Sequence, residues 1–246
     1  MSDLPELKLI LLQAINAVFD EFVHSEFRTA CAQGCAICCT QNVTATTLEA
    51  LSIVRILNDT GRADLLDRLP EAAKMELFRP RLTTNTLAMA CISHQEPPVE
   101  EPPAFLDRCL FLEDNLCQVY PVRPFTCRGM FASTICQSGM EAEIPFGLDT
   151  LMSICWQIVE HLDGGGLYGN LIDLLLLLND PNQRFKYETG QQLVQRGLPP
   201  TRPVPGFLIP PEHQDLAQRF LNQLFNTDCE GRTFRERMSE TRKSPF

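Results

Sequence analysis

Cysteine is the residue type with the most evident chemistry in this sequence, and its spacing is uneven. Two groups account for eight of the 11 cysteines, and they are Cys31, Cys35, Cys38 and Cys39, then Cys109, Cys117, Cys127 and Cys136. Thiolates bind zinc in tetrahedral sites and bind the irons of iron–sulfur clusters. Ligands from a distant segment usually complete such a site. The two groups therefore predict a metal centre that joins two separated chain segments.

Eight thiols exceed the need of one tetrahedral site. Cys38 and Cys39 are adjacent, so their side chains point roughly 100° apart on a helix or to opposite faces of a strand. We expect one of them to face the main centre while the other serves a second metal or packs in the core, and the spacing does not say which. Arg123 and Arg128 flank Cys127. Positive charge favours a thiolate and supplies hydrogen bonds to an anionic centre.

The overall composition predicts a cytoplasmic protein in which clustered cysteines bind metal instead of forming disulfides. The 246 residues are 44% hydrophobic with a net charge of −10, which argues against binding to nucleic acid or to an anionic membrane. The N-terminus lacks a basic leader segment. The most apolar stretch, 171–178, is interrupted by Asp173 and is much shorter than the roughly 20 residues that cross a bilayer. A reducing compartment disfavours structural disulfides.

Apolar spacing predicts a mainly α fold that must position these cysteines. We expect helices over 6–28, 47–58, 148–162, 171–178 and 212–225, and a helical stretch over 62–78 that bends or restarts at Pro70. Thr46 and Glu49 form a capping-box pattern for the second of these helices. The prolines in 95–103 and 199–211 predict loops, and the polar tail from 231 to 246 is expected to be frayed.

A small β-hairpin is expected at the metal site. Residues 109–120 show two apolar stretches around a turn at 113–115, so the hairpin would bring Cys109 close to Cys117. Pro124 is suited to begin a helical turn that carries Cys127. The predicted organisation is a cysteine-cluster metal-binding domain over 1–140, with a helical segment over 141–246 packed on it.

The cysteine pattern resembles a known family. Cys31-x3-Cys35-x2-Cys38-Cys39 is followed by Cys109-x-Phe-Leu-x-x-Asn-x-Cys117-x-Val-Tyr120-x-x-Arg123-Pro124-x-x-Cys127-Arg128. This series is similar to that of the YkgJ-type cysteine-cluster family, described as zinc- or iron-chelating, and the flagellin lysine N-methylases resemble it too. The resemblance covers about 31–136. It implies a metal-bound domain, with an iron–sulfur cluster favoured over zinc, and implies little about a reaction.

Three functions follow as hypotheses. The first is a cytoplasmic protein whose iron–sulfur cluster, or zinc, stabilises the fold and serves a redox or sensing role. The second is a protein lysine N-methyltransferase-like enzyme that uses S-adenosylmethionine, as the resemblance to the flagellin enzymes implies. The third is a structural zinc module or metal carrier that acts through an unidentified protein partner.

Other interpretations of the cysteines have less support. The spacing 31, 35, 38 also matches the radical S-adenosylmethionine motif, but Ile37 stands where that motif usually has an aromatic residue, and the strand–helix alternation of a β/α barrel is absent. Buried free thiols or a disulfide relay remain simpler alternatives. Cys91 with His94 is expected not to bind metal, and Cys155 could be a ligand or a core residue. No phosphate-binding loop or hydrolase motif supports a specific enzyme class.

Overall fold

Ten α-helices make up most of the fold in the computed structural model, which describes residues 4–32, 34–101, 103, 107–137 and 142–241. The helices are α1 (Leu4–Glu26), α2 (Thr47–Asp59), α3 (Leu69–Ala72), α4 (Thr84–Ile92), α5 (Phe125–Arg128), α6 (Leu148–Leu162), α7 (Leu171–Asn179), α8 (Pro181–Glu188), α9 (Gln214–Asn226) and α10 (Phe234–Glu240). Short 3-10 helices cover Ala63–Arg68, Tyr120–Val122 and Pro211–His213. The predicted mainly α fold is confirmed.

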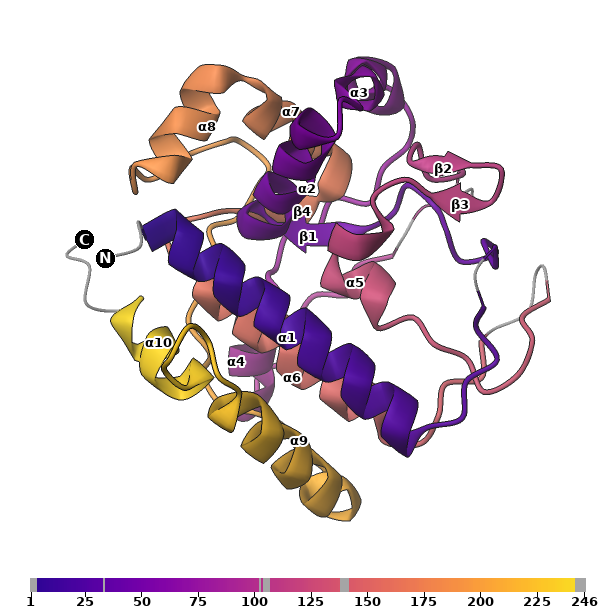
Figure 1. The fold of residues 1–246 in the computed structure, drawn as a ribbon, viewed down its shortest axis with the longest axis vertical. Helices are drawn as coiled ribbons and strands as arrows, with labels where there is room; N and C mark the ends of the chain where they lie inside the picture. The colour runs from indigo at the N-terminus through magenta and orange to yellow at the C-terminus, as the bar shows by residue number, and fades with distance from the viewer. Residues whose placement is uncertain (1–3, 33, 102, 104–106, 138–141, 242–246) are drawn as a thin grey trace.

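Helix α1 runs across the middle of the molecule and organises its packing (Figure 1). Its sequence repeats large apolar residues at helical spacing, and these are fully or almost fully buried at Leu11, Ile15, Phe19 and Phe22. The buried face contacts α2 and α6, and α9 and α10 also pack against the helix. Because α6, α9 and α10 come from the second half of the chain, α1 joins the two halves.

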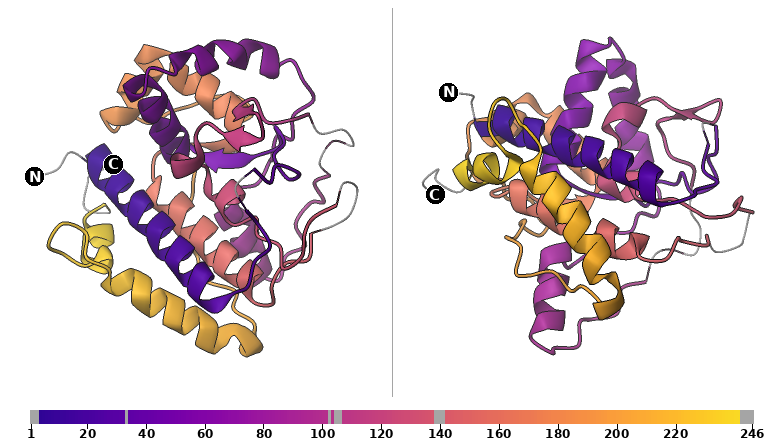
Figure 2. Two further views of the ribbon diagram at one scale, coloured as in Figure 1. Left: turned by 45° about the vertical axis from the view of Figure 1, so that its right-hand side comes forward. Right: turned by 60° about the horizontal axis from the view of Figure 1, so that its bottom comes forward.

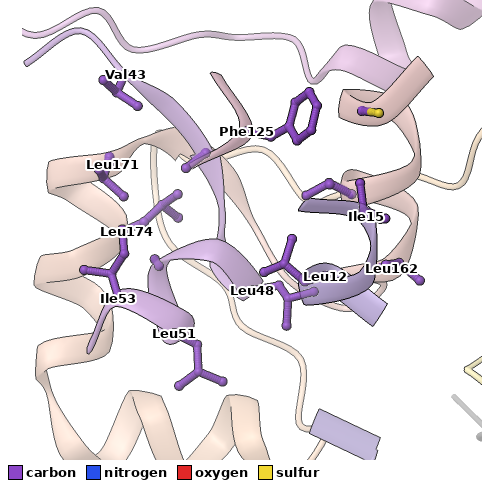
Figure 3. Close-up of a cluster of buried hydrophobic side chains, with 14 of the residues drawn as sticks. Leu12, Ile15, Val43, Leu48, Leu51, Ile53, Phe125, Leu162, Leu171 and Leu174 are labelled. Atoms are coloured by element: carbon purple, nitrogen blue, oxygen red, sulfur yellow. The ribbon is translucent and has the colours of Figure 1, made fainter. Parts of the chain in front are cut away.

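One hydrophobic core extends through both halves of the sequence. Figure 3 shows side chains from α1, α2, α5, α6 and α7 in one cluster that includes Leu48 and Phe125, both almost completely buried. Helix α2 packs along α7, so the capping-box helix predicted from Thr46 and Glu49 lies at the centre of the fold. The predicted boundary at 140 lies within 138–141, outside the described residues, and the division into 1–140 and 141–246 stays a prediction.

In the part of the chain that the structure describes, two small antiparallel sheets connect the helices. The predicted hairpin is confirmed as β2 (Leu112–Glu113) and β3 (Leu116–Cys117), in which Leu112 pairs with Cys117. Asp114 and Asn115 form its turn with φ of 49° and 62°, the left-handed values that a type I′ hairpin turn requires. The other sheet pairs β1 (Thr44–Thr46) with β4 (Tyr168–Asn170), which links the start of α2 to the start of α7.

The C-terminal region differs from the expectation of a frayed tail from residue 231. Residues 234–240 form α10, which begins with a capping box between Thr233 and Glu236 and buries Phe234 completely. Residues 242–246 of that predicted tail lie outside the described residues. The stretch predicted as helical over 62–78 restarts near Pro70 as expected, but α3 already ends at Ala72. None of the described helices is long and apolar enough to span a bilayer.

Candidate metal centre

The two cysteine segments lie on the side of the molecule away from the chain termini. Figures 1 and 2 show the indigo chain between α1 and β1 next to the hairpin and to the pink chain after α5. Two tight turns shape the first segment, because the Cys35 amide donates to the Ala32 carbonyl at 3.0 Å and the Cys39 amide to Ala36 at 3.2 Å. Gly34 has φ of +86°, a conformation that side chains disfavour.

Backbone hydrogen bonds join the two segments at both ends of the first one. At one end, the Cys109 amide donates to the Cys39 carbonyl at 3.1 Å, and the Gln41 amide donates to the Asp107 carbonyl at 2.9 Å. At the other end, the Ala30 amide donates to the Ala132 carbonyl at 2.8 Å. The cysteines between positions 31 and 39 are therefore held against the hairpin at one end and against the chain after α5 at the other.

Four thiols that come from three places in the fold lie close together, and we call them the inner thiol group. They are Cys39 of the first segment, Cys109 and Cys117 of the hairpin region, and Cys127 of α5. Cys39 interacts electrostatically with the other three, and Cys127 does so with Cys109 and Cys117. The hairpin therefore brings Cys109 and Cys117 together as predicted.

The other four thiols are also neighbours, and we call them the outer thiol group. They are Cys31, Cys35, Cys38 and Cys136. Cys31 interacts electrostatically with the other three. Cys35 and Cys38 are exposed to solvent, whereas Cys31 and Cys136 are half-buried. Cys38 lies at the junction of the two groups, because it hydrogen-bonds to Cys39 and also interacts with Cys127.

Protonation differs among the inner thiols. The hydrogen bond from Cys38 lowers the pKa of the Cys39 thiol and thus favours its thiolate form. Burial raises the pKa of Cys109 to about 11, and burial also raises the pKa of Cys127 and of Cys117. Between the two adjacent cysteines, Cys39 is thus the one that faces the inner group, with Cys38 as its hydrogen-bond donor.

The inner group suits a thiophilic metal by donor number and type. Four free thiols match the ligand set of a tetrahedral zinc site or of a [4Fe–4S] cluster. The four thiols are neighbours, but they are not arranged as a coordination shell. In the described part of the chain, no three Cys, His, Asp or Glu side chains are placed to hold a metal ion. Metal binding would therefore have to displace the thiol protons and draw the segments closer.

Glu49 positions α5 and hence Cys127, a role that the capping-box pattern alone did not indicate. One carboxylate oxygen accepts from the Thr46 amide at 2.8 Å and from the Thr46 hydroxyl at 2.9 Å. The other accepts from the Phe125 amide at 2.6 Å, at the start of α5. A capping box predicts the bond from the Thr46 amide, but the bond from the Phe125 amide joins residues 76 positions apart and has no local sequence signal.

The two arginines beside Cys127 serve other partners than expected. Arg128 is buried and binds the Asp20 carboxylate on α1 and the Pro121 carbonyl, so it ties the hairpin region to α1. Arg123 lies over the Tyr120 ring, 3.8 Å from its centroid, and its charge partly lowers the pKa of Cys117, which burial raises. The prediction that both arginines favour the thiolate of Cys127 is therefore wrong, because α1 supplies a carboxylate that binds Arg128.

The remaining cysteines have other surroundings. Cys155 is completely buried in the hydrophobic core on α6, which agrees with a packing role. Cys229 is buried between α9 and α10. Cys91 is exposed on α4, and His94 follows that helix with a positive φ of 54°. None of these four residues belongs to the inner or the outer thiol group.

Comparison with known proteins finds one family whose model matches the region that contains both cysteine segments. Residues 30–144 match the CxxCxxCC family, which is described as "Putative zinc- or iron-chelating domain". The match spans 115 of the 246 residues and contains every member of the inner and outer thiol groups. No curated protein and no solved structure matches the chain. The family description supports metal binding by this region and leaves both zinc and iron as candidates.

Proposed function

We propose that the protein is a cytoplasmic iron–sulfur protein whose cluster is bound by the inner thiol group, since residues 30–144 match the CxxCxxCC family, described as a zinc- or iron-chelating domain. The observation that carries the proposal is the meeting of Cys39, Cys109, Cys117 and Cys127 from three elements of the fold. An all-sulfur set suits an iron–sulfur cluster, in which a thiolate binds each iron. The resemblance of the cysteine pattern also favours iron–sulfur over zinc.

The chain contributes position and environment to such a centre. The cluster would supply one-electron redox chemistry when bound. The hairpin and α5 present Cys109, Cys117 and Cys127, and burial of these thiols limits their contact with water. Burial and nearby charge, such as that of Arg123 beside Cys117, are the means by which a protein sets the reduction potential of a cluster. A redox or sensing role follows from this environment.

The first test is chemical analysis of protein purified without oxygen. Iron and acid-labile sulfide in matching amounts, with a brown colour, would support the proposal. Cys127→Ser should lose this iron, whereas Cys91→Ser, at an exposed position on α4, should keep it. Iron that remains in Cys127→Ser, or the absence of iron from the unmodified protein, would contradict the proposal.

Zinc in the inner thiol group is the alternative that the same four thiols allow. The protein would then be colourless, contain zinc without sulfide, and act as a structural module or carrier. Exchange would separate these two roles, because a structural zinc ion leaves only when the fold opens. A chelator that removes zinc without changing the far-ultraviolet circular dichroism would favour a carrier.

A further inference from the structure

A cavity of about 380 Å³ lies between α7, the start of α8, the turn at 195–198 and Arg79, which precedes α4. We propose that it binds a small amphipathic carboxylate, a molecule with one carboxylate group on an apolar body. The volume lies within the range of small-molecule sites in proteins. Helices α7 and α8 lie side by side (Figure 1). No cysteine lines the cavity, so this inference goes beyond the proposed function and does not depend on the metal that the protein holds.

Leucine side chains form the apolar floor of this cavity. Helix α7 buries one face in the core, with Leu178 at 0% exposure, whereas Leu176 and Leu177 on the opposite face are partly exposed and line the cavity. Leu198 completes the floor, and it is held there because its side chain fills the space that a Cβ at Gly169 would need. A ligand that covers these leucines must therefore present an apolar surface to them.

The two carboxylates that line the cavity already have partners within the protein. Asp173 accepts from Nε of Arg79 at 2.7 Å and from Nη2 of the same guanidinium at 3.1 Å, so the two charges offset each other. Asp180 accepts from the Asn182 amide at 2.8 Å as the N-cap of α8, where the positive end of the helix dipole stabilises its charge. Neither acid therefore depends on a cationic ligand for its charge balance.

Arg196 supplies the charge that remains without a partner. The Leu198 amide donates to the Gln195 carbonyl at 3.2 Å and closes a turn in which Gly197 has φ of +86°. This turn places Arg196 in the lining, and among the described residues its guanidinium has no ion-pair or hydrogen-bond partner. Gln183 and Gln195 add side-chain amides that can donate to the same anion. The unmatched charge is thus positive and lies beside an apolar floor, which favours an amphipathic carboxylate.

Octanoate is the probe, and calorimetry on the full-length protein with its metal in place measures the binding. We expect one saturable site per chain. The net charge of −10 disfavours anions in general, so such binding requires a local cation. Affinity should fall about fourfold for each methylene removed between octanoate and hexanoate, because each one loses contact with the leucine floor.

Two neutral or cationic analogues test whether the carboxylate itself is recognised. 1-Octanol has the same apolar chain without a charge and should bind about two- to fivefold more weakly, the range of an exposed ion pair. The octylammonium ion should show no saturable binding, because it would meet the unpaired guanidinium of Arg196. Equal or tighter binding of either analogue would overturn the inference.

Variants of Arg196 locate the site. The side chain is exposed, so the fold should be unchanged, as circular dichroism would verify. Arg196→Gln should weaken octanoate binding about two- to fivefold, and Arg196→Glu should abolish saturable binding. Arg28→Gln removes an exposed arginine outside the cavity and should bind octanoate like the unmodified protein. Unchanged affinity in both Arg196 variants, or no saturable binding of octanoate to the unmodified protein, would overturn the inference. Absence of iron would contradict only the proposed iron–sulfur function.

Discussion

Glu49 has a greater influence on the candidate centre than its distance from the cysteines in sequence suggests. Its buried carboxylate accepts three hydrogen bonds, two from Thr46 and one from the Phe125 amide at the start of α5. Glu49→Gln replaces one accepting oxygen with a donating NH2 group, which cannot accept from these donors. We expect a loss of about 1.5–3 kcal/mol in the free energy of unfolding, measured in urea. Metal content should fall as well, because α5 carries Cys127.

Glu236 provides the matched control, because it forms the same capping box with Thr233 on α10. Its bonds to the Thr233 amide and hydroxyl involve one oxygen in an exposed setting, so Glu236→Gln can turn its remaining oxygen toward them. This change should cost about 0.5 kcal/mol and leave metal content unaltered. Equal effects of the two substitutions would show that Glu49 acts only as a helix cap.

Asp163 makes stability depend on pH in a direction opposite to that of most paired carboxylates. Burial raises its pKa from 3.8 to about 7, and the Lys8 charge and the Tyr187 hydroxyl only partly offset this. Between these two values the folded state binds more protons than the unfolded state. The free energy of unfolding therefore falls as pH rises from about 4 to about 7 on account of this group. The stabilising contribution is complete below pH 4 and lost above pH 7.

Urea unfolding at pH 5 and pH 8 tests this dependence. Asp163→Asn should show a smaller decrease in the free energy of unfolding between the two pH values than the unmodified protein. Asp215→Asn removes a carboxylate whose side chain is 90% exposed and should leave the decrease unchanged. An identical decrease in both variants would assign the pH dependence to other buried carboxylates, such as Glu160.

At the scale of elements, α10 is expected to stabilise the fold through one side chain. Phe234 at its start is completely buried and lies near Phe225 of α9, with ring centroids 6.2 Å apart. Phe234→Ala should therefore lower the free energy of unfolding by about 3–5 kcal/mol, seen as a reduced melting temperature. Phe185→Ala, at a position that is 62% exposed, should change it by about 0.5 kcal/mol or less. A neutral Phe234→Ala would restore the expectation of a frayed tail.

Helices with strong local signals could be predicted from the sequence, and those that depend on distant contacts could not. The apolar repeat of α1, the Thr46 capping box and the Asp114–Asn115 turn each act within a few residues. By contrast, β1 and β4 are three residues long and pair across more than 120 positions. Helix α8 is absent from the helices expected from the sequence, although it has a local sequence signal. Asp180 caps the helix and Pro181 occupies its first turn.

In the candidate site, too, local features could be predicted from the sequence and contacts between distant residues could not. Cysteine spacing predicted all eight thiols as candidate ligands, because it reflects donor chemistry that is visible in the sequence, and their metal binding stays a prediction. Their division into inner and outer groups depends on how the chain folds between positions 30 and 41 and against 107–132, which only the structure shows. The role of Arg128 was mistaken for a related reason, since its partner Asp20 lies 108 positions away.

At the scale of the whole molecule, the hydrophobic core and the metal-binding segments are stabilised in different ways. Helices α1, α2, α6 and α7 bury a continuous apolar core, whereas the first cysteine segment is held by turns and a few backbone hydrogen bonds. Metal should therefore stabilise the protein by mass action on an already folded core. For an ion at 100 times its dissociation constant this amounts to about 2.7 kcal/mol. Metal removal should lower the melting temperature while the helices remain.

Hydrogen exchange can locate this effect. In metal-free protein, amides in 30–41 and 107–132 should exchange faster, because their contacts are the ones that metal reinforces. Amides of α2 and α7 should stay protected, since their contacts lie in the core around Leu48, Leu51 and Leu174, and far-ultraviolet circular dichroism should keep its helical signal. Loss of protection throughout α2 and α7 would instead mean that the core cannot form without metal, so that metal binding and folding are a single event.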